Sequence, residues 1–134
     1  PLDAASDISM NHIMFGEISA WYYKALGGIF PDEEQPGFKN IILKPNFVSG
    51  LEQFEATYKG PHGTILSSWE KKKDNVVYKV TIPSNSKAKL YLKGSIIHES
   101  GNLLNMNNLI KVVKHEQNNY ILELKAGNYN FEIK

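Results

Sequence analysis

The hydrophobic pattern of this chain changes its period once, near residue 39, and that change limits the folds open to it. Between Ser9 and Ile29, apolar residues recur every three or four positions, which is helical spacing. From Lys39 to Lys134 they alternate, in short runs separated by Gly, Pro, Asn and Ser. About eight or nine strands with turn signals every eight to twelve residues are typical of an antiparallel β-sandwich, including jelly rolls. We therefore predict a mainly β, jelly-roll-like sandwich preceded by one α-helix over about residues 12–26.

The expected strands can be placed by the alternation of their side chains. They cover residues 40–47, 51–59, 64–73, 76–82, 88–92, 95–99, 109–115, 120–125 and 129–133. In the third strand, Ile65 and Trp69 point to one side with Ser67 between them, so we expect Trp69 in the core. The stretch 100–108 is rich in Gly and Asn and is predicted to turn. Its apolar residues, expected to be buried plugs, are Leu103, Leu104 and Met106.

The predicted helix is apolar around most of its circumference. Its main stripe consists of Phe15, Ile18, Trp21, Tyr22, Ala25 and Leu26, and Met14, Ala20 and Tyr23 fall off it. Such helices are normally buried on two sides. Since nothing else in the chain could cover a second side, we expect that this helix has lost its neighbours. Gly27-Gly28 provides its stop, because a glycine can adopt the left-handed conformation that closes a helix.

Composition excludes several classes of protein. Fifteen basic against fourteen acidic residues give a net charge of +1, which argues against an electrostatic nucleic-acid surface. No apolar run approaches the roughly eighteen residues that span a bilayer. Cysteine is absent, so disulfides and thiol nucleophiles are excluded, while a cytoplasmic, periplasmic or secreted location stays open. The start at Pro1, without a methionine, fits a piece of something longer.

Two stretches together carry a family resemblance. The run MNHIMFGEISAWYYKALGGI, followed by DEEQPGFKNIILKPNFVSGLEQFEATYKGPHGTILSSW, resembles the C-terminal end of bacterial α-L-rhamnosidases of glycoside hydrolase family 78. In that family the last helices of an (α/α)6 barrel carry N-H-x-x-F-G-x-x-x-x-W. A linker with P-G-F/Y-K then leads into a C-terminal β-sandwich. The resemblance is densest from Ser9 to Trp69 and is compatible in strand rhythm to Lys134.

The resemblance implies a domain division and an activity. Residues 1–36 would be the end of the barrel, with the linker near residues 30–38, and residues 37–134 the C-terminal sandwich. The parent would remove terminal α-L-rhamnose from glycans or glycosides by inverting hydrolysis, with the sandwich bracing the barrel. It implies a rhamnose-containing carbohydrate as partner. From the residues themselves we expect no cofactor, metal, nucleic acid or membrane as partner.

His12 is the best candidate site residue, next to Asn11 at the start of the predicted helix. From the residues alone, a lone histidine there is more often a capping or packing residue. The resemblance reverses that reading, because the histidine of N-H-x-x-F-G lines the sugar subsite and hydrogen-bonds rhamnose hydroxyls. We therefore expect His12 to bind substrate and Asn11 to orient the helix start.

No acid and base pair for an inverting glycosidase can be found among the carboxylates. Glu17 lies five positions after His12 and so points about 140° away around the helix. Asp32, Glu33 and Glu34 are on the predicted linker, and Asp3 and Asp7 are in the N-terminal loop. In the resembled family the general base lies upstream of the motif, before Pro1. We therefore expect no catalytic residue here, and an inactive fragment.

Two other functions remain open on the sequence. The sandwich could bind carbohydrate on an aromatic face, or it could be a purely structural accessory domain. The tyrosines that could form such a face are Tyr58, Tyr78, Tyr91, Tyr120 and Tyr129. For Trp21 and Trp69 the spacing favours core over a sugar platform. The unpartnered helix 12–26 is also expected to pack on the sandwich, to pair with a second copy in a homodimer, or to exchange between chains.

Overall fold

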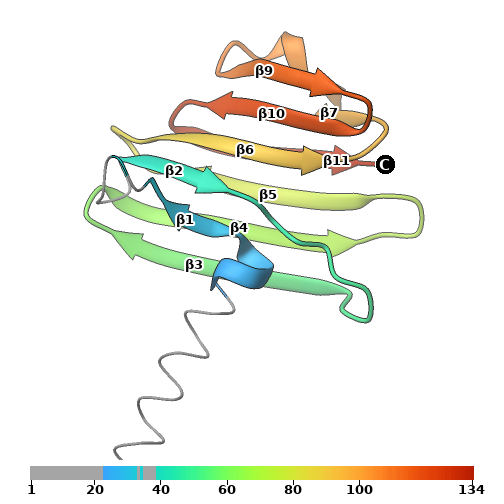
Figure 1. Cartoon of the computed structure of the whole chain (residues 1–134), viewed down its shortest axis with the longest axis horizontal. Coiled ribbons are helices and arrows are strands. Elements are labelled where there is room, and N and C mark those ends of the chain that lie inside the picture. The colour runs from blue at the N-terminus through green and yellow to red at the C-terminus, as the bar shows by residue number, and fades with distance from the viewer. Residues whose placement is uncertain (1–22, 33, 35–38) are drawn as a thin grey trace, which may run out of the picture.

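The computed structural model describes residues 23–32, 34 and 39–134 (Figure 1). Most of the predicted helix, with Asn11 and His12 at its start, lies outside the described residues. The described part of this segment is a π-helical turn, η1 (Tyr23–Gly27). Gly28 follows with φ of 65°, in the left-handed region. The stop predicted at Gly27-Gly28 is therefore confirmed.

The described strands form two sheets that pack face to face. One sheet has the order β1 (Ile29–Pro31), β2 (Asn40–Leu43), β6 (Lys87–Lys93), β10 (Asn119–Leu124), β9 (Ile110–Glu116). The other has the order β3 (Gln53–Gly60), β4 (Gly63–Lys71), β5 (Val76–Ile82), β11 (Gly127–Ile133), β7 (Ile97–Glu99), β8 (Asn102–Leu103). Their strands run in nearly the same direction, which is the aligned form of sheet packing (Figure 1). The predicted β-sandwich is confirmed.

Alternation along the strands explains why the two sheets meet. In β5 the buried side chains are Tyr78, Val80 and Ile82, and in β6 they are Ala88, Leu90 and Leu92. The side chains between them face outward, because successive residues of a strand point to opposite sides. The centre of the core is completed by Ile41, Leu43, Ile65, Trp69, Leu122, Leu124 and Phe131. Trp69, 1% exposed, is in the core as predicted.

The structure differs from the expected strands in three places. Ile29–Pro31, assigned to the linker, forms β1 and pairs antiparallel with β2. A proline is tolerated there because β1 is an edge strand, where one side of the backbone needs no partner. The strand expected over residues 40–47 is β2, which ends at Leu43 and not at Phe47, since Pro45 cannot continue a ladder. The strand β2 also pairs parallel with β6, within an otherwise antiparallel arrangement of the described strands.

The apolar plugs predicted in residues 100–108 are only partly right. The segment forms β8 and a 3-10 turn, η2 (Leu104–Met106). Leu104 is buried, but Leu103 and Met106 are 60% and 72% exposed. A turn this short directs one side chain inward, so burial of Leu104 leaves its neighbours on the surface.

Candidate functional site

The two predicted substrate-binding residues, Asn11 and His12, lie outside the described residues, as do Glu17, Trp21 and Tyr22. Asp32 and Glu34 are described, and they belong to one turn after β1. The Glu34 backbone N–H donates to Asp32 Oδ1 at 3.0 Å. Within the described part of the chain, the relevant feature is therefore the place where the end of the predicted helix enters the sandwich.

The last carbonyls of η1 are bound by side chains of β4. Trp69 Nε1 donates to the Leu26 carbonyl at 3.1 Å, and Ser67 Oγ donates to the Gly27 carbonyl at 2.6 Å. A helix end leaves its final carbonyls without partners inside the helix. Both carbonyls are buried here, so without these donors they would carry a desolvation penalty. We call this contact, made by Leu26, Gly27, Ser67, Trp69 and Tyr78, the junction.

Tyr78 extends the junction into the centre of the core. Its hydroxyl lies 2.9 Å from Ser67 Oγ. Because the single Ser67 proton is directed to Gly27, Tyr78 is the donor and the chain runs from Tyr78 to Ser67 to the carbonyl. Burial raises the pKa of Tyr78 well above its usual value, and the bond to Ser67 opposes this only in part. Phe47 packs edge-on against Trp69 and Tyr78, at 5.6 Å and 6.0 Å between centroids.

Two glycines let the backbone of η1 approach the sandwich closely. A Cβ on Gly27 would lie 2.7 Å from the Ala56 Cβ of β3. A Cβ on Gly28 would lie 2.1 Å from the Lys44 carbonyl, and the positive φ of Gly28 also disfavours a side chain. The turn η1 lies against β3 as a result (Figure 1).

Sequence reasoning placed Ser67 on the core side of its strand but did not find its role. The available signal was a hydroxyl alternating with Ile65 and Trp69, because a buried polar group requires a hydrogen-bond partner. The partner itself could not be inferred, since Gly27 lies 40 residues earlier in the chain.

A second feature lies beside the junction, where β2 leaves β6. Their parallel pairing ends at Leu43 and Leu90, whereas β6 continues to Lys93. The chain from Lys44 to Phe47 diverges and leaves an open cleft of about 700 Å³. Its walls are residues 44–47, 91–93 and 119–121. We call this the β6 cleft.

Of the five tyrosines considered for a sugar-binding face, Tyr58 is exposed on β3, and the other four divide into two groups. Tyr78 and Tyr129 are buried, so neither can stack on a ligand at the surface. Tyr91 and Tyr120 are half-buried and line the β6 cleft. The Lys44 ammonium lies 4.8 Å from the Tyr91 ring centroid and the Lys89 ammonium 5.9 Å. Of these two tyrosines, Tyr91 lies on the outer face of the sheet, whereas Tyr120 lies opposite the buried Leu92, packs against the core and stacks on His115.

The described residues contain no group of three or more His, Cys, Asp or Glu side chains that could hold a metal ion. In the same part of the chain, no helix has the length and apolar character needed to cross a membrane.

Comparison with known proteins identifies relatives for nearly the whole chain. The profile of the bacterial alpha-L-rhamnosidase C-terminal domain matches residues 28–101. An alpha-L-rhamnosidase of Formosa agariphila is 32% identical over 130 residues, which are 94% of this chain and 14% of that protein. One from Alteromonas sp. is 33% identical over 127 residues, covering 93% of this chain and 12% of the relative. The chain thus spans about an eighth of the length of these relatives.

Solved structures show the same fold. The alpha-L-rhamnosidase from Dictyoglumus thermophilum matches with a TM-score of 0.73 and 26% identity, over 92% of this chain and 14% of that structure. The Streptomyces avermitilis alpha-L-rhamnosidase complexed with L-rhamnose matches with a TM-score of 0.71 and 19% identity. That match covers 85% of this chain and 10% of the other, and at this identity it shows the fold alone.

Proposed function

The chain belongs to the bacterial alpha-L-rhamnosidase C-terminal domain family, and from this we propose that it is the C-terminal part of a glycosidase that removes terminal α-L-rhamnose. The match over residues 28–101, with alpha-L-rhamnosidases at 32% and 33% identity across most of the chain, carries the proposal. The substrate is a rhamnose-containing glycan or glycoside. The reaction is hydrolysis with inversion, using an acid and a base upstream of residue 1.

We divide the chain functionally near residue 36. Residues 1–36 end the helical catalytic domain, with His12 binding substrate hydroxyls and Asn11 orienting the helix start. Residues 37–134 form the accessory sandwich, to which β1 contributes one edge strand. The isolated chain is inactive, because it lacks the acid and the base.

The role of the sandwich is to brace the helix that carries His12. The junction supports this proposal, because Trp69 and Ser67 bind the last two carbonyls of η1 from a strand inside the sandwich core. If the predicted helix runs from His12 to η1, the position of the His12 side chain depends on where η1 is held. Since a displacement of about 1 Å can cost a hundredfold in rate, bracing has catalytic consequences.

The experiment is an assay of the parent, with its upstream sequence restored, on a chromogenic α-L-rhamnoside. We expect hydrolysis by the parent, none by residues 1–134, and an axial-to-equatorial inversion detectable by NMR of the first product. His12→Ala should lower kcat/KM, with Glu34→Ala as a control on an exposed turn. An inactive parent, or an unchanged His12→Ala variant, would contradict the assignment of activity or of His12 respectively.

In the isolated chain, the apolar helix predicted over residues 12–26 would have no catalytic domain to pack on. We propose that it then pairs with a second copy, and light scattering of residues 1–134 tests this. A dimer that is lost when residues 1–22 are removed is expected. A monomer at all concentrations would contradict the pairing.

A further inference from the structure

The end of η1 is held from a second side by the chain that connects β2 to β3. The Lys44 N–H donates to the Gly28 carbonyl at 2.8 Å, and the Asn46 N–H donates to the Leu26 carbonyl at 3.4 Å. This chain leaves the end of β2 and passes beside η1 on its way to β3 (Figure 1). We call residues 44–48 the strap.

The strap and the junction meet at the same groups. The Leu26 carbonyl accepts from the strap as well as from Trp69 Nε1. Phe47 of the strap packs edge-on against Trp69 and Tyr78, the two aromatic residues of the junction. The end of η1 is therefore held by strand side chains on one side and by the backbone of the strap on the other.

Lys71, the last residue of β4, fixes the far end of the strap. Its Nζ donates to the Val48 carbonyl at 2.5 Å, and its backbone N–H donates to the Glu52 carbonyl at 2.7 Å. One residue of the sandwich thus binds both ends of the turn over residues 48–52, which connects the strap to β3. In the described part of the chain, Lys71 makes no hydrogen bond to η1 itself, so any effect on η1 passes through the strap.

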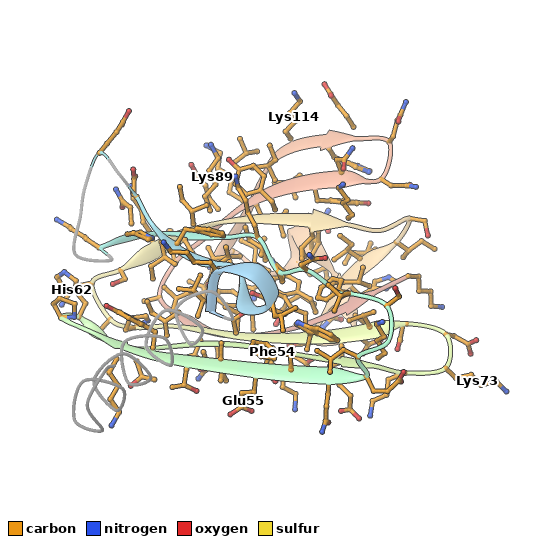
Figure 2. The ribbon with its side chains drawn as sticks, turned by 60° about the horizontal axis from the view of Figure 1, so that its bottom comes forward. Phe54, Glu55, His62, Lys73, Lys89 and Lys114 are labelled. Carbon is orange, nitrogen blue, oxygen red and sulfur yellow. The ribbon has the colours of Figure 1, made fainter. Side chains whose placement is uncertain are left out.

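The three successive lysines at this end of β4 have different surroundings. Lys71 is half-buried, and its Nζ lies 5.9 Å from the centroid of the Trp69 ring. Lys72 is exposed and pairs with Glu70. Lys73 is exposed at the β4–β5 turn and points away from the molecule (Figure 2). A hydrogen bond from a charged donor is stronger than one between neutral groups, so the contact of Lys71 with Val48 is the one with structural weight.

We infer that Lys71 is a positioning residue of the parent enzyme: it holds Val48, which fixes the strap, and the strap fixes the end of η1. The inference rests on the proposed function, because the predicted helix that ends at η1 is the one on which His12 lies. It adds to the junction a second support of η1, controlled by a residue that binds neither η1 nor substrate.

Loss of the Lys71 bond should open the strap while the sheets stay intact. The strap lies between β2 and β3 and belongs to neither sheet. Segments outside the sheet ladders open locally at a lower free energy than the whole domain unfolds. The amides of Lys44 and Asn46 report this opening, since their partners are the carbonyls of η1 and Gly28.

Hydrogen exchange followed by NMR on residues 1–134 tests this step. In Lys71→Met, which keeps the aliphatic stem but has no donor, the amides of Lys44 and Asn46 should exchange at least about tenfold faster. The amides of β11, inside the six-stranded sheet, should exchange as before. Lys71→Arg keeps a charged donor and should restore slow exchange, and Lys73→Met is the matched control without effect.

The kinetics of the parent on a chromogenic α-L-rhamnoside test the consequence for the enzyme. Below the unfolding temperature, Lys71→Met should raise KM at least about threefold, because a displaced His12 would bind the sugar hydroxyls less well. A variant that was only partly folded would instead lose kcat in proportion and keep its KM. Lys71→Arg should restore KM, and Lys73→Met should leave it unchanged.

Three outcomes would overturn the inference. Unchanged exchange of Lys44 and Asn46 in Lys71→Met would show that Lys71 does not fix the strap. Faster exchange with an unchanged KM would show that the strap does not position the substrate-binding end of the helix. Effects of Lys73→Met as large as those of Lys71→Met would remove the special role of Lys71. A parent that hydrolyses no rhamnoside would contradict the proposed function, whereas the exchange measurement decides on its own whether Lys71 holds the strap.

Discussion

Trp69 Nε1 donates a 3.1 Å hydrogen bond to the carbonyl of Leu26, a residue 43 positions earlier in the chain. The indole is buried in the sandwich core, whereas the carbonyl ends the turn that leads out of the predicted helix. A side chain inside the sandwich thus binds a carbonyl at the end of η1. The two parts of the chain are joined through hydrogen bonds as well as through the covalent backbone.

Ser67→Ala should lower the free energy of unfolding by about 1–3 kcal/mol, because it leaves the Gly27 carbonyl and the Tyr78 hydroxyl buried without their partner. Ser68→Ala is the matched control, one residue along on the outward side of β4. Urea denaturation of both variants measures the difference. Equal stabilities would mean that the hydrogen bonds of Ser67 contribute nothing to stability.

Gly27→Ala should destabilise the protein by about 1–3 kcal/mol, since its new Cβ would lie 2.7 Å from the Ala56 Cβ. Adding Ala56→Gly removes the opposing atom and should recover part of the loss, which a double-mutant cycle would measure as a favourable coupling. Gly28→Ala should not be recovered in this way, because it meets the Lys44 backbone. Strict additivity of Gly27→Ala and Ala56→Gly would contradict the close contact.

Stability should fall steeply at alkaline pH. Burial first, and then the nearby Glu99 carboxylate, raise the pKa of Tyr129 to about 12, although the bond to the Lys125 carbonyl lowers it. An unfolded tyrosine has a pKa of about 10. Below pH 10 both states hold the proton, so the stabilisation is complete. Between pH 10 and 12 the unfolded state loses the proton first, and the free energy of unfolding falls.

Chemical denaturation at several pH values from 8 to 12 measures this slope. Tyr129→Phe should make the decline shallower, whatever its effect on stability at pH 8. The burial of Tyr78 raises the pKa of that phenol in the same direction, so Tyr78→Phe should also reduce the slope. If, for both variants, the free energy of unfolding fell with pH as steeply as in the unmodified protein, the two phenols would not be the groups that cause the decline.

Glu99→Gln should destabilise the protein by about 1–3 kcal/mol despite its similar size. The carboxylate is 5% exposed and accepts from Ser100 Oγ at 2.6 Å, Asn107 Nδ2 at 3.0 Å and the Asn130 N–H at 3.3 Å. In glutamine, one carboxylate oxygen is replaced by an NH2 group, which is a hydrogen-bond donor and would face groups that are themselves donors. Glu123→Gln, on an exposed side chain, is the control, and thermal unfolding compares them. A smaller loss for Glu99→Gln than for the control would be contrary to this network.

Much of the fold could be predicted because a half-buried strand displays its orientation in its sequence. The strand at residues 76–82 has the predicted bounds, and those of the strands at residues 119–124 and 127–133 differ by one or two positions. The edge strand β1 was missed because Pro31 is normally a signal against strand. The exposed side chains of Leu103 and Met106 were missed because hydrophobicity does not say which side chain of a short turn faces inward.

The junction and the outer face of the five-stranded sheet depend on relations between distant residues that local sequence patterns do not contain. Ser67 and Gly27 meet only through folding, 40 positions apart. The lysines of β6 and β9 share one outer face because β10 lies between these strands, and neither strand order nor register is given by the alternation. For Asn11 and His12, the substrate-binding role is still a prediction from the family resemblance, since these residues lie outside the described part of the chain.

The bracing role of the junction is tested most directly by the kcat/KM of the parent enzyme carrying Ser67→Ala together with Trp69→Phe, measured on a chromogenic α-L-rhamnoside well below the unfolding temperature. If the sandwich positions the helix that carries His12, kcat/KM should fall at least about tenfold while the variant stays folded, with Ser68→Ala unchanged. A folded double variant with the kcat/KM of the unmodified parent would contradict the account.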